Sequence, residues 1–336
     1  MMRPRLSFAF DPHKTRHVFD DEALQRLGAV CEVVSAEPLT SFSTPEARAV
    51  LSQTEVLVTG WGCPMLSPDV LRAAPNLKLI AHAAGTVKFT VDYSAYATGI
   101  RVTHAAEANA VPVAEFTLAA ILFANKRMFE LRDLYRADPT RRSSHELMDM
   151  PIGNFRRTVG LVGASRIGRK VAAMLAGFDL DVLLSDPFVA ADDPIARQVE
   201  LVELDALMAR SDVVSVHAPS LPSTRHMIGA RQLKLMQDGA TFINTARGAL
   251  VDEAALVAEL QTGRIHAVID VTDPEIPPAT SPLFTLPNVF LTPHVAGAIG
   301  TERARLGLMV VEEVERFVRG EPMLYEIEPA LLERLA

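Results

Sequence analysis

The sequence predicts an α/β fold built from two doubly wound parallel sheets. Short apolar segments alternate with longer amphipathic segments, and parallel strands joined by crossover helices produce this alternation. The 336 residues are enough for two domains, and 49% apolar with 22% charged residues is typical of a globular chain with a sizeable core. A polar stretch at 132–149, rich in Arg, Asp and Ser, separates the two regions and is interpreted as a surface linker.

The first region supplies one sheet. Its predicted strands lie at 6–10, 30–34, 56–59 and 77–81. Helices are expected between them at 20–27, 44–51 and 67–73. The third helix has a clear start, because Ser67 can cap its N-terminus and Pro68 fits the first helical turn. One long apolar helix then follows at 108–128.

The second region supplies a larger sheet with six predicted strands. They lie at 158–162, 182–185, 213–217, 241–244, 267–271 and 289–292. All are short and mostly apolar, like strands that are buried on both faces. Crossover helices are expected at 166–177, 203–209, 230–236 and 253–260, and an amphipathic helix at 301–319 ends the pattern. This arrangement fits a dinucleotide-binding fold.

Composition excludes several classes of partner. The 33 basic and 41 acidic residues give a net charge of −8 without a basic stripe, so nucleic acid is not expected as a partner. Cys31 and Cys63 are too few for a disulfide framework and favour a reducing, cytoplasmic setting. No apolar run reaches the roughly 18 residues of a membrane helix, and the N-terminus does not resemble a signal peptide. We expect neither a membrane partner nor a metal.

A glycine-containing turn at 159–168 predicts the cofactor site. The pattern is Gly163-x-Ser165-x-x-Gly168, where a dinucleotide fingerprint has glycine at all three positions. Ser165 is a small replacement whose hydroxyl could contact a phosphate, although an ordinary strand-to-helix turn would read similarly. Asp186 ends the next predicted strand, where an acid binds the ribose hydroxyls of NAD and repels the phosphate of NADP. Together these features predict NAD.

Three polar residues follow predicted strand ends in the same region, namely Arg247, Glu275 and His294. Open α/β sheets bind ligands at that edge. Reduction of a 2-keto acid needs a cation for the carboxylate, a proton donor that works near neutral pH, and an anion to orient the donor. Each residue alone could be a solvated loop residue, whereas the set indicates a hydroxy-acid dehydrogenase.

At these residues the chain resembles the D-isomer-specific 2-hydroxyacid dehydrogenases. Segments 244–252 and 291–297 are similar to two family signatures, and 270–275 resembles Asp-Val-Phe-x-x-Glu. Segments 216–219, 224–226 and 113–115 also resemble family blocks, and the match as a whole runs from about Val56 to Gly297. Ser165, Thr272 and Ile276 depart from the family pattern.

The resemblance implies a Rossmann NAD-binding domain at 104–297, inserted into a flavodoxin-like substrate domain formed by 1–103 and 298–336. Arg247 would bind the substrate, His294 would exchange the proton, and Glu275 would pair with His294. The loop of Ala84, Gly85 and Thr86 would hold the substrate carboxylate. Expected cofactor contacts are Gly163, Ser165, Arg166, Ile167, Gly168, Asp186, His217, Ala218, Pro219, Thr245, Ala246, Arg247, Asp270, His294 and Gly297.

The sequence therefore predicts an NAD-dependent reductase of small 2-keto acids, similar to glyoxylate or hydroxypyruvate, that yields D-2-hydroxy acids. The resemblance also implies a homodimer formed through the cofactor domains, with helix 108–128 and the following arm at the interface. The alternative is an NAD(H)-sensing protein like the co-repressors of the same family, although no added partner-binding tail is expected. The physiological acid stays open, as does the question of whether His82, Lys88, Trp61 or Met65 shapes the substrate pocket.

Overall fold

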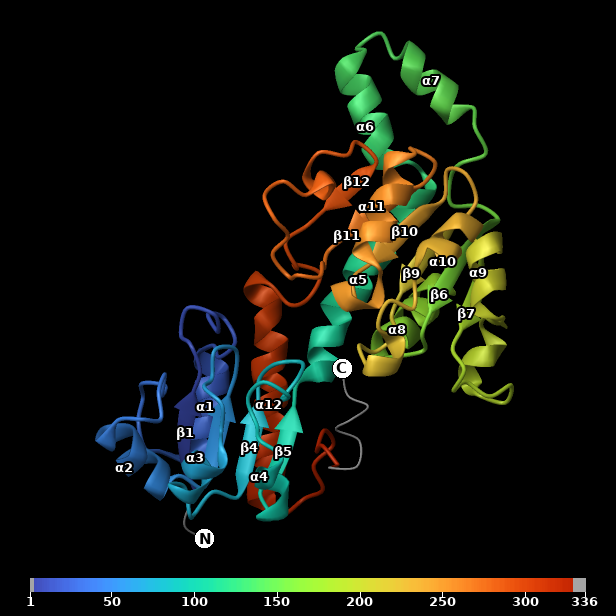
Figure 1. Ribbon diagram of the computed structural model, residues 1–336. Coiled ribbons are helices and arrows are strands. Elements are labelled where there is room, and N and C mark those ends of the chain that lie inside the picture. Colours follow the sequence, from blue (N-terminus) through green and yellow to red (C-terminus); the bar gives the residue numbers. More distant parts are fainter. Residues whose placement is uncertain (1–2, 329–336) are drawn as a thin grey trace. The chain divides into compact units, whose positions relative to one another are not determined.

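The structure is a computed structural model that describes residues 3–328 (Figure 1). These residues form two compact units, each with its own sheet. The first unit comprises the described residues up to Ala110 and from Ala298 onward, and the second is Val111–Gly297. The first division lies inside one continuous helix, α5 (Ala106–Asn125), and not at the predicted boundary of 103/104.

The sheet of the first unit is parallel throughout its described strands. Its order is β2-β1-β3-β4-β5, which is the order of flavodoxin-like folds. The strands are β1 (Arg5–Ala9), β2 (Glu32–Val33), β3 (Val56–Thr59), β4 (Leu79–His82) and β5 (Arg101–His104). Strand β5 was absent from the sequence prediction because its alternation of polar and apolar residues lacks an apolar run.

Helices cover both faces of this sheet. They are α1 (Asp21–Val30), α2 (Pro45–Gln53), α3 (Pro68–Arg72), α4 (Ser94–Ala97) and α12 (Ala304–Arg319). Asp20, Thr44 and Ser67 cap the first three, each side chain accepting a hydrogen bond from an amide of the first turn. Helix α12 approaches the chain closely at Gly307, where a Cβ would lie 1.8 Å from the carbonyl oxygen of Val18.

The second unit holds a larger parallel sheet of order β12-β11-β10-β9-β6-β7-β8 (Figure 1). Its strands are β6 (Arg157–Val162), β7 (Leu180–Ser185), β8 (Glu200–Leu201), β9 (Val213–Val216), β10 (Thr241–Asn244), β11 (His266–Ile269) and β12 (Val289–Leu291). The strand order reverses between β6 and β9, as in dinucleotide-binding folds. Strand β8 was not predicted because two residues carry no pattern.

The crossover helices of this sheet are α8 (Arg166–Leu175), α9 (Leu204–Arg210), α10 (Ala230–Leu235) and α11 (Glu253–Gln261). Single 3₁₀ turns lie at Pro194–Arg197, Pro222–Thr224, Gly248–Leu250, Pro282–Phe284 and Gly300–Arg303. The central strands are buried along their whole length, which explains their apolar sequences.

The predicted linker at 132–149 is wrong, since most of it is helical. Helix α5 ends at Asn125, and Arg127 then adopts a left-handed conformation with φ of 52°. The chain continues as α6 (Met128–Ala137) and α7 (Arg142–Met148), which extend beyond the sheet as an arm (Figure 1). The predicted helix 108–128 therefore ends earlier, because Arg127 breaks the helical path.

Helix α5 is long and apolar enough, by length and composition alone, to cross a membrane. The sequence suggested no such run because its longest apolar stretch, 118–124, is flanked by Glu115 and Lys126. From Ala114 to Ala124 one face of the helix packs into the core of the second unit, against buried residues of β6, α8 and β10. This packing is that of a core helix.

Candidate active site

The glycine turn after β6 has the close packing that a cofactor turn requires. Gly163 has φ of 100°, and a Cβ there would lie 2.6 Å from the amide nitrogen of Ala218. A Cβ on Gly168 would lie 2.1 Å from the carbonyl oxygen of Gly163. Side chains at both positions would displace backbone, so both glycines are sterically required.

Ser165 occupies the middle position of the fingerprint and begins helix α8. Its Oγ accepts a hydrogen bond from the amide of Gly168 at 3.4 Å, which makes it the N-cap. Arg166 and Ile167 form the first turn of the same helix. The N-terminus of a helix that follows such a turn suits the pyrophosphate of a dinucleotide.

Asp186 follows β7 and connects that strand to the glycine turn. One carboxylate oxygen accepts the amide of Ala164 at 2.7 Å, and the other accepts the amide of Phe188 at 2.9 Å. A carboxylate offers about four lone-pair sites, so acceptor capacity remains for ribose hydroxyls.

The segment of His217, Ala218 and Pro219 leaves β9 beside Gly163. The His217 ring is buried and shares a 2.9 Å hydrogen bond between Nε2 and Ser215 Oγ. Its Nδ1 has no hydrogen-bond partner among residues 3–328. Burial lowers the pKa of His217 to about 3, so the ring is neutral and belongs to the interior.

Arg247 lies on the loop after β10, and Asn244 shapes this loop. The side-chain oxygen of Asn244 accepts the amide of Ala246 at 3.1 Å, and its nitrogen donates to the carbonyl of Arg247 at 2.9 Å. Thr245 Oγ1 lies 3.0 Å from Thr117 Oγ1. Desolvation lowers the pKa of Arg247 and the Glu275 carboxylate opposes this, but the residue is solvent-exposed and an arginine stays charged.

The Arg247 loop packs directly on the loop after β11. A Cβ on Gly248 would lie 2.0 Å from the carbonyl carbon of Thr272, so the two backbones touch there. The Thr272 hydroxyl contacts the carbonyls of Pro274 at 2.8 Å and of Glu275 at 3.1 Å. Thr272, which departs from the family pattern, thus fixes the segment that carries Glu275.

His294 and Glu275 meet at this edge of the sheet. His294 Nδ1 is in hydrogen-bond contact with Glu275 Oε1, and both side chains are about half exposed. His294 has φ of 55°, in the left-handed region that few residues other than glycine adopt. A backbone outlier of this kind is held in place by its surroundings and is common at functional sites.

Asp270 fixes the backbone around His294. Its buried carboxylate accepts hydrogen bonds from the Thr292 hydroxyl at 2.6 Å and from the amides of Val295 and Ala296 at 2.8 and 2.9 Å. Its carbonyl accepts the amide of His294 at 2.9 Å. The sequence reasoning expected Asp270 at the cofactor and missed this function, which only contacts between distant loops reveal.

The predicted substrate loop lies in the first unit, after β4. The carbonyl of Ala84 accepts the amide of Ala105 at 3.1 Å, while Gly85 and Thr86 are partly exposed. Beneath them His82 is buried, with Nδ1 2.8 Å from Thr59 Oγ1 and a hydrogen bond to the Thr86 backbone. Burial and nearby His104 lower the pKa of His82 to about 4.

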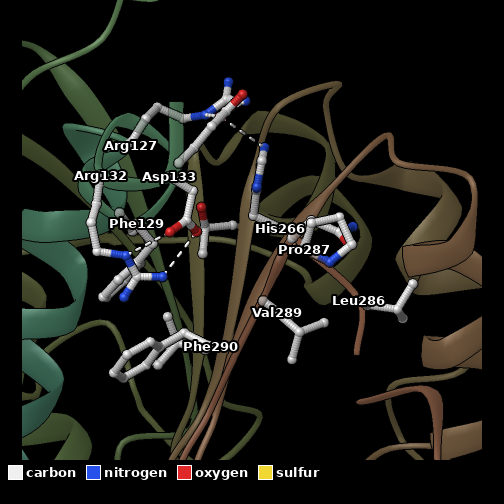
Figure 2. A pocket seen from close by; sticks show the side chains of 15 residues that line it. Arg127, Phe129, Arg132, Asp133, His266, Leu286, Pro287, Val289 and Phe290 are labelled. Carbon is white, nitrogen blue, oxygen red and sulfur yellow. Dashed lines mark hydrogen bonds and ion pairs between the residues drawn. The ribbon is translucent and has the colours of Figure 1, made fainter. Parts of the chain in front are cut away.

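A separate cavity of about 190 Å³ lies at the opposite edge of the larger sheet (Figure 2). It opens between α6 and the amino-terminal ends of β10, β11 and β12, where Phe129 stacks on Phe290 with ring centroids 4.3 Å apart. Its charged side chains are already paired, as in the bond between Arg127 and Glu130. Because ligands bind these sheets at the carboxyl edge, the cavity is not the candidate active site.

Comparison with known proteins identifies the larger unit. Residues 118–296 match the family model described as D-isomer specific 2-hydroxyacid dehydrogenase, NAD binding domain. The chain is 37% identical over 281 residues to a D-3-phosphoglycerate dehydrogenase of Mycobacterium leprae, covering 83% of this chain and 51% of that protein. It is 36% identical to a glyoxylate reductase of Korarchaeum cryptofilum, covering 76% and 77%. The chain thus spans about half the length of the phosphoglycerate dehydrogenases that it matches.

The fold of this chain is similar to that of a solved structure over nearly its whole length. A D-lactate dehydrogenase from Treponema pallidum is 27% identical, has a TM-score of 0.76, and matches 97% of this chain and 100% of its own. These relatives bear the names of enzymes, which gives no support to the NAD(H)-sensing alternative.

Proposed function

Since the chain belongs to the family of D-isomer-specific 2-hydroxyacid dehydrogenases, we propose that it reduces small 2-keto acids to D-2-hydroxy acids with NADH. The contact between His294 and Glu275 carries this proposal, together with the hydrogen bonds by which Asp270 fixes the loop of His294. A substrate similar to glyoxylate or hydroxypyruvate fits the name of one relative, a glyoxylate reductase.

Each residue has a chemical task in this proposal. Arg247 binds the substrate carboxylate and polarises the keto carbonyl, because a guanidinium presents two parallel donors. His294 donates the proton that the carbonyl oxygen gains, and Glu275 orients the imidazole. Bound NADH supplies the hydride. Gly163, Gly168 and the N-terminus of α8 fit its pyrophosphate, and Asp186 fits its ribose.

The first unit acts as the substrate domain in this proposal, through the backbone of Ala84, Gly85 and Thr86. The second unit acts as the cofactor domain. Cys31 and Cys63 are free and buried, and two such cysteines without a disulfide support a cytoplasmic location, because disulfides are typical of oxidising compartments.

The test is NADH oxidation with glyoxylate, hydroxypyruvate and longer 2-keto acids, followed as loss of absorbance. We expect turnover with at least one acid and a D-configured product on chiral analysis. NADH binding without turnover of any acid would contradict the proposal.

We also propose a homodimer formed through the second unit. Large apolar side chains are exposed on and around the arm, which is unfavourable for a monomer. They are Phe123, Met128, Tyr135, Met148, Met150 and Phe155. Light scattering at micromolar concentration should give twice the 36.5 kDa chain mass, and a monomer would contradict this part of the proposal.

A further inference from the structure

An arginine stacked on a tryptophan lies at the edge of the first unit's sheet. The guanidinium carbon of Arg303 is 5.4 Å from the centroid of the Trp61 ring, and its Nε donates to the carbonyl of Ala298 at 3.4 Å. Among residues 3–328, no carboxylate forms an ion pair with Arg303. An aromatic face holds a guanidinium in one orientation and leaves its outer N–H groups available.

Direct contacts connect this pair to the proposed substrate loop. The side-chain oxygen of Asn109 accepts the amide of Ala298, the residue that also binds Arg303, at 3.2 Å. The side-chain nitrogen of Asn109 faces Gly85, at 3.5 Å from where a Cβ would stand. Gly85, Asn109, Ala298 and Arg303 are therefore contiguous within one unit.

Several cationic side chains are exposed on the same unit, although the whole chain carries −8 and Glu302 precedes Arg303. The loop after β1 exposes His13, Lys14, Arg16 and His17, and Lys88 is exposed just beyond the substrate loop. The nearby carboxylate of Asp11 is already bound to the amide of His13 at 2.9 Å and lies 4.0 Å from Lys14. A local surplus of cations attracts anionic substrates and raises their local concentration.

We propose that Arg303, stacked on Trp61, is a second anion-binding residue of the substrate site, so that the protein prefers 2-keto acids carrying another anionic group. The inference rests on the proposed function and narrows its substrate class. The loop at Ala84–Thr86, in the same unit, engages the keto-acid carboxylate, and Arg303 binds the distal carboxylate or phosphate. A guanidinium accommodates either group through paired hydrogen bonds.

Kinetics with matched substrates test this preference. Oxaloacetate differs from 2-oxobutyrate by a carboxylate in place of a methyl group, and 3-phosphohydroxypyruvate differs from hydroxypyruvate by a phosphate. We expect a higher kcat/KM for the member with the second anionic group in at least one pair, and the pair affected identifies the distal group. Equal kcat/KM values within both pairs would overturn the inference while leaving the proposed function intact.

The variant Arg303→Gln removes the charge and keeps a polar side chain. It should lower kcat/KM for the preferred acid with two anionic groups by about 10- to 100-fold, since a hydrogen bond to a charged group contributes that much affinity. Monoanionic acids should change by less than about 3-fold. Arg303→Lys should recover part of the loss, and Arg48→Gln, an exposed arginine on α2, is the matched control. Equal losses for both substrate types would overturn the inference.

A binding measurement needs no turnover. Trp61 is the chain's single tryptophan, so its fluorescence reports directly on this pair. Succinate should change the emission of the cofactor-free protein, butyrate should not, and Arg303→Gln should abolish the response. If succinate and butyrate act alike, the inference fails. If no keto acid is reduced but succinate still binds, the proposed function fails and the anion site stands.

Discussion

The carboxyl edges of the two sheets present different kinds of groups to a ligand. In the second unit the proposed chemistry rests on exposed side chains, Arg247, His294 and Glu275, on loops held by internal hydrogen bonds. In the first unit the predicted contact is backbone, and the side chains of His82, which is buried, and Asn109, which is partly buried, pack against it. Side chains proposed to react form short motifs that can be recognised in the sequence, whereas side chains that support a backbone loop form no such motif.

Burial also separates two acidic residues that follow the same strand. Asp270 and Glu275 are both acids after β11, yet Asp270 is buried and organises backbone while Glu275 is exposed and meets His294. Burial decides the difference, because a buried carboxylate must satisfy its oxygens within the protein.

The variant His294→Ala tests the proposed proton donor of the second unit and should have the largest effect. General acid–base catalysis is typically worth about 10²–10⁴-fold, and kcat for keto-acid reduction should fall by that factor. Affinity for NADH, measured by fluorescence titration, should be kept. Glu275→Gln should lose less, because it orients the imidazole without transferring the proton. Near-normal turnover by His294→Ala would refute the assigned mechanism.

Replacing Arg247 with Ala should have the next largest effect. We expect kcat/KM to drop by about 10²–10³-fold, the usual loss when one donor to a developing oxyanion is removed. Steady-state kinetics should show KM rising and kcat falling together, since the residue binds the ground state and the transition state. Arg247→Lys should rescue little, because an ammonium lacks the planar fork. Full rescue by lysine would show that charge alone suffices.

One pH effect should be common to both units. His82 in the first and His217 in the second have pKa values lowered by burial to about 4 and about 3. Below the ordinary histidine pKa of about 6.5 the unfolded chain binds protons that the folded chain excludes. Stability should therefore be unaffected by these groups at pH 8 and fall as the pH drops from about 6.5 toward 4, by about 1.4 kcal/mol per pH unit for each histidine.

Urea unfolding at several pH values measures this slope. His82→Gln and His217→Gln should each reduce the dependence of the unfolding free energy on pH by the contribution of one histidine, whatever the stability of the variant at pH 8. If both variants keep the slope of the parent chain, the two histidines are not the cause.

The smallest expected effect concerns cofactor choice. Asp186 should favour NADH over NADPH, because its carboxylate accepts from ribose hydroxyls and repels a 2′-phosphate. Asp186→Ser should reduce kcat/KM with NADH by about tenfold, the scale of one hydrogen bond to a charged group, and narrow the gap to NADPH. Equal use of both cofactors by the parent chain would contradict the role.

Most strands could be predicted from sequence because burial on both faces leaves an apolar run. The exceptions have physical reasons. Strand β5 includes Arg101 and His104, strand β8 has two residues, and the arm helices α6 and α7 are polar enough to resemble a linker. Such elements are stabilised by neighbours in space, which a local pattern does not record.

The sequence by itself determined the glycine turn, the acid after β7, and the positions of Arg247 and His294 after their strands. It did so because parallel strands bring their carboxyl ends to one edge, so position along the chain implies position in space. Only the tertiary structure decided that Asp270 holds the His294 loop and that Arg303 stacks on Trp61. These contacts join segments far apart in sequence, and side-chain packing, rather than local propensity, brings them together.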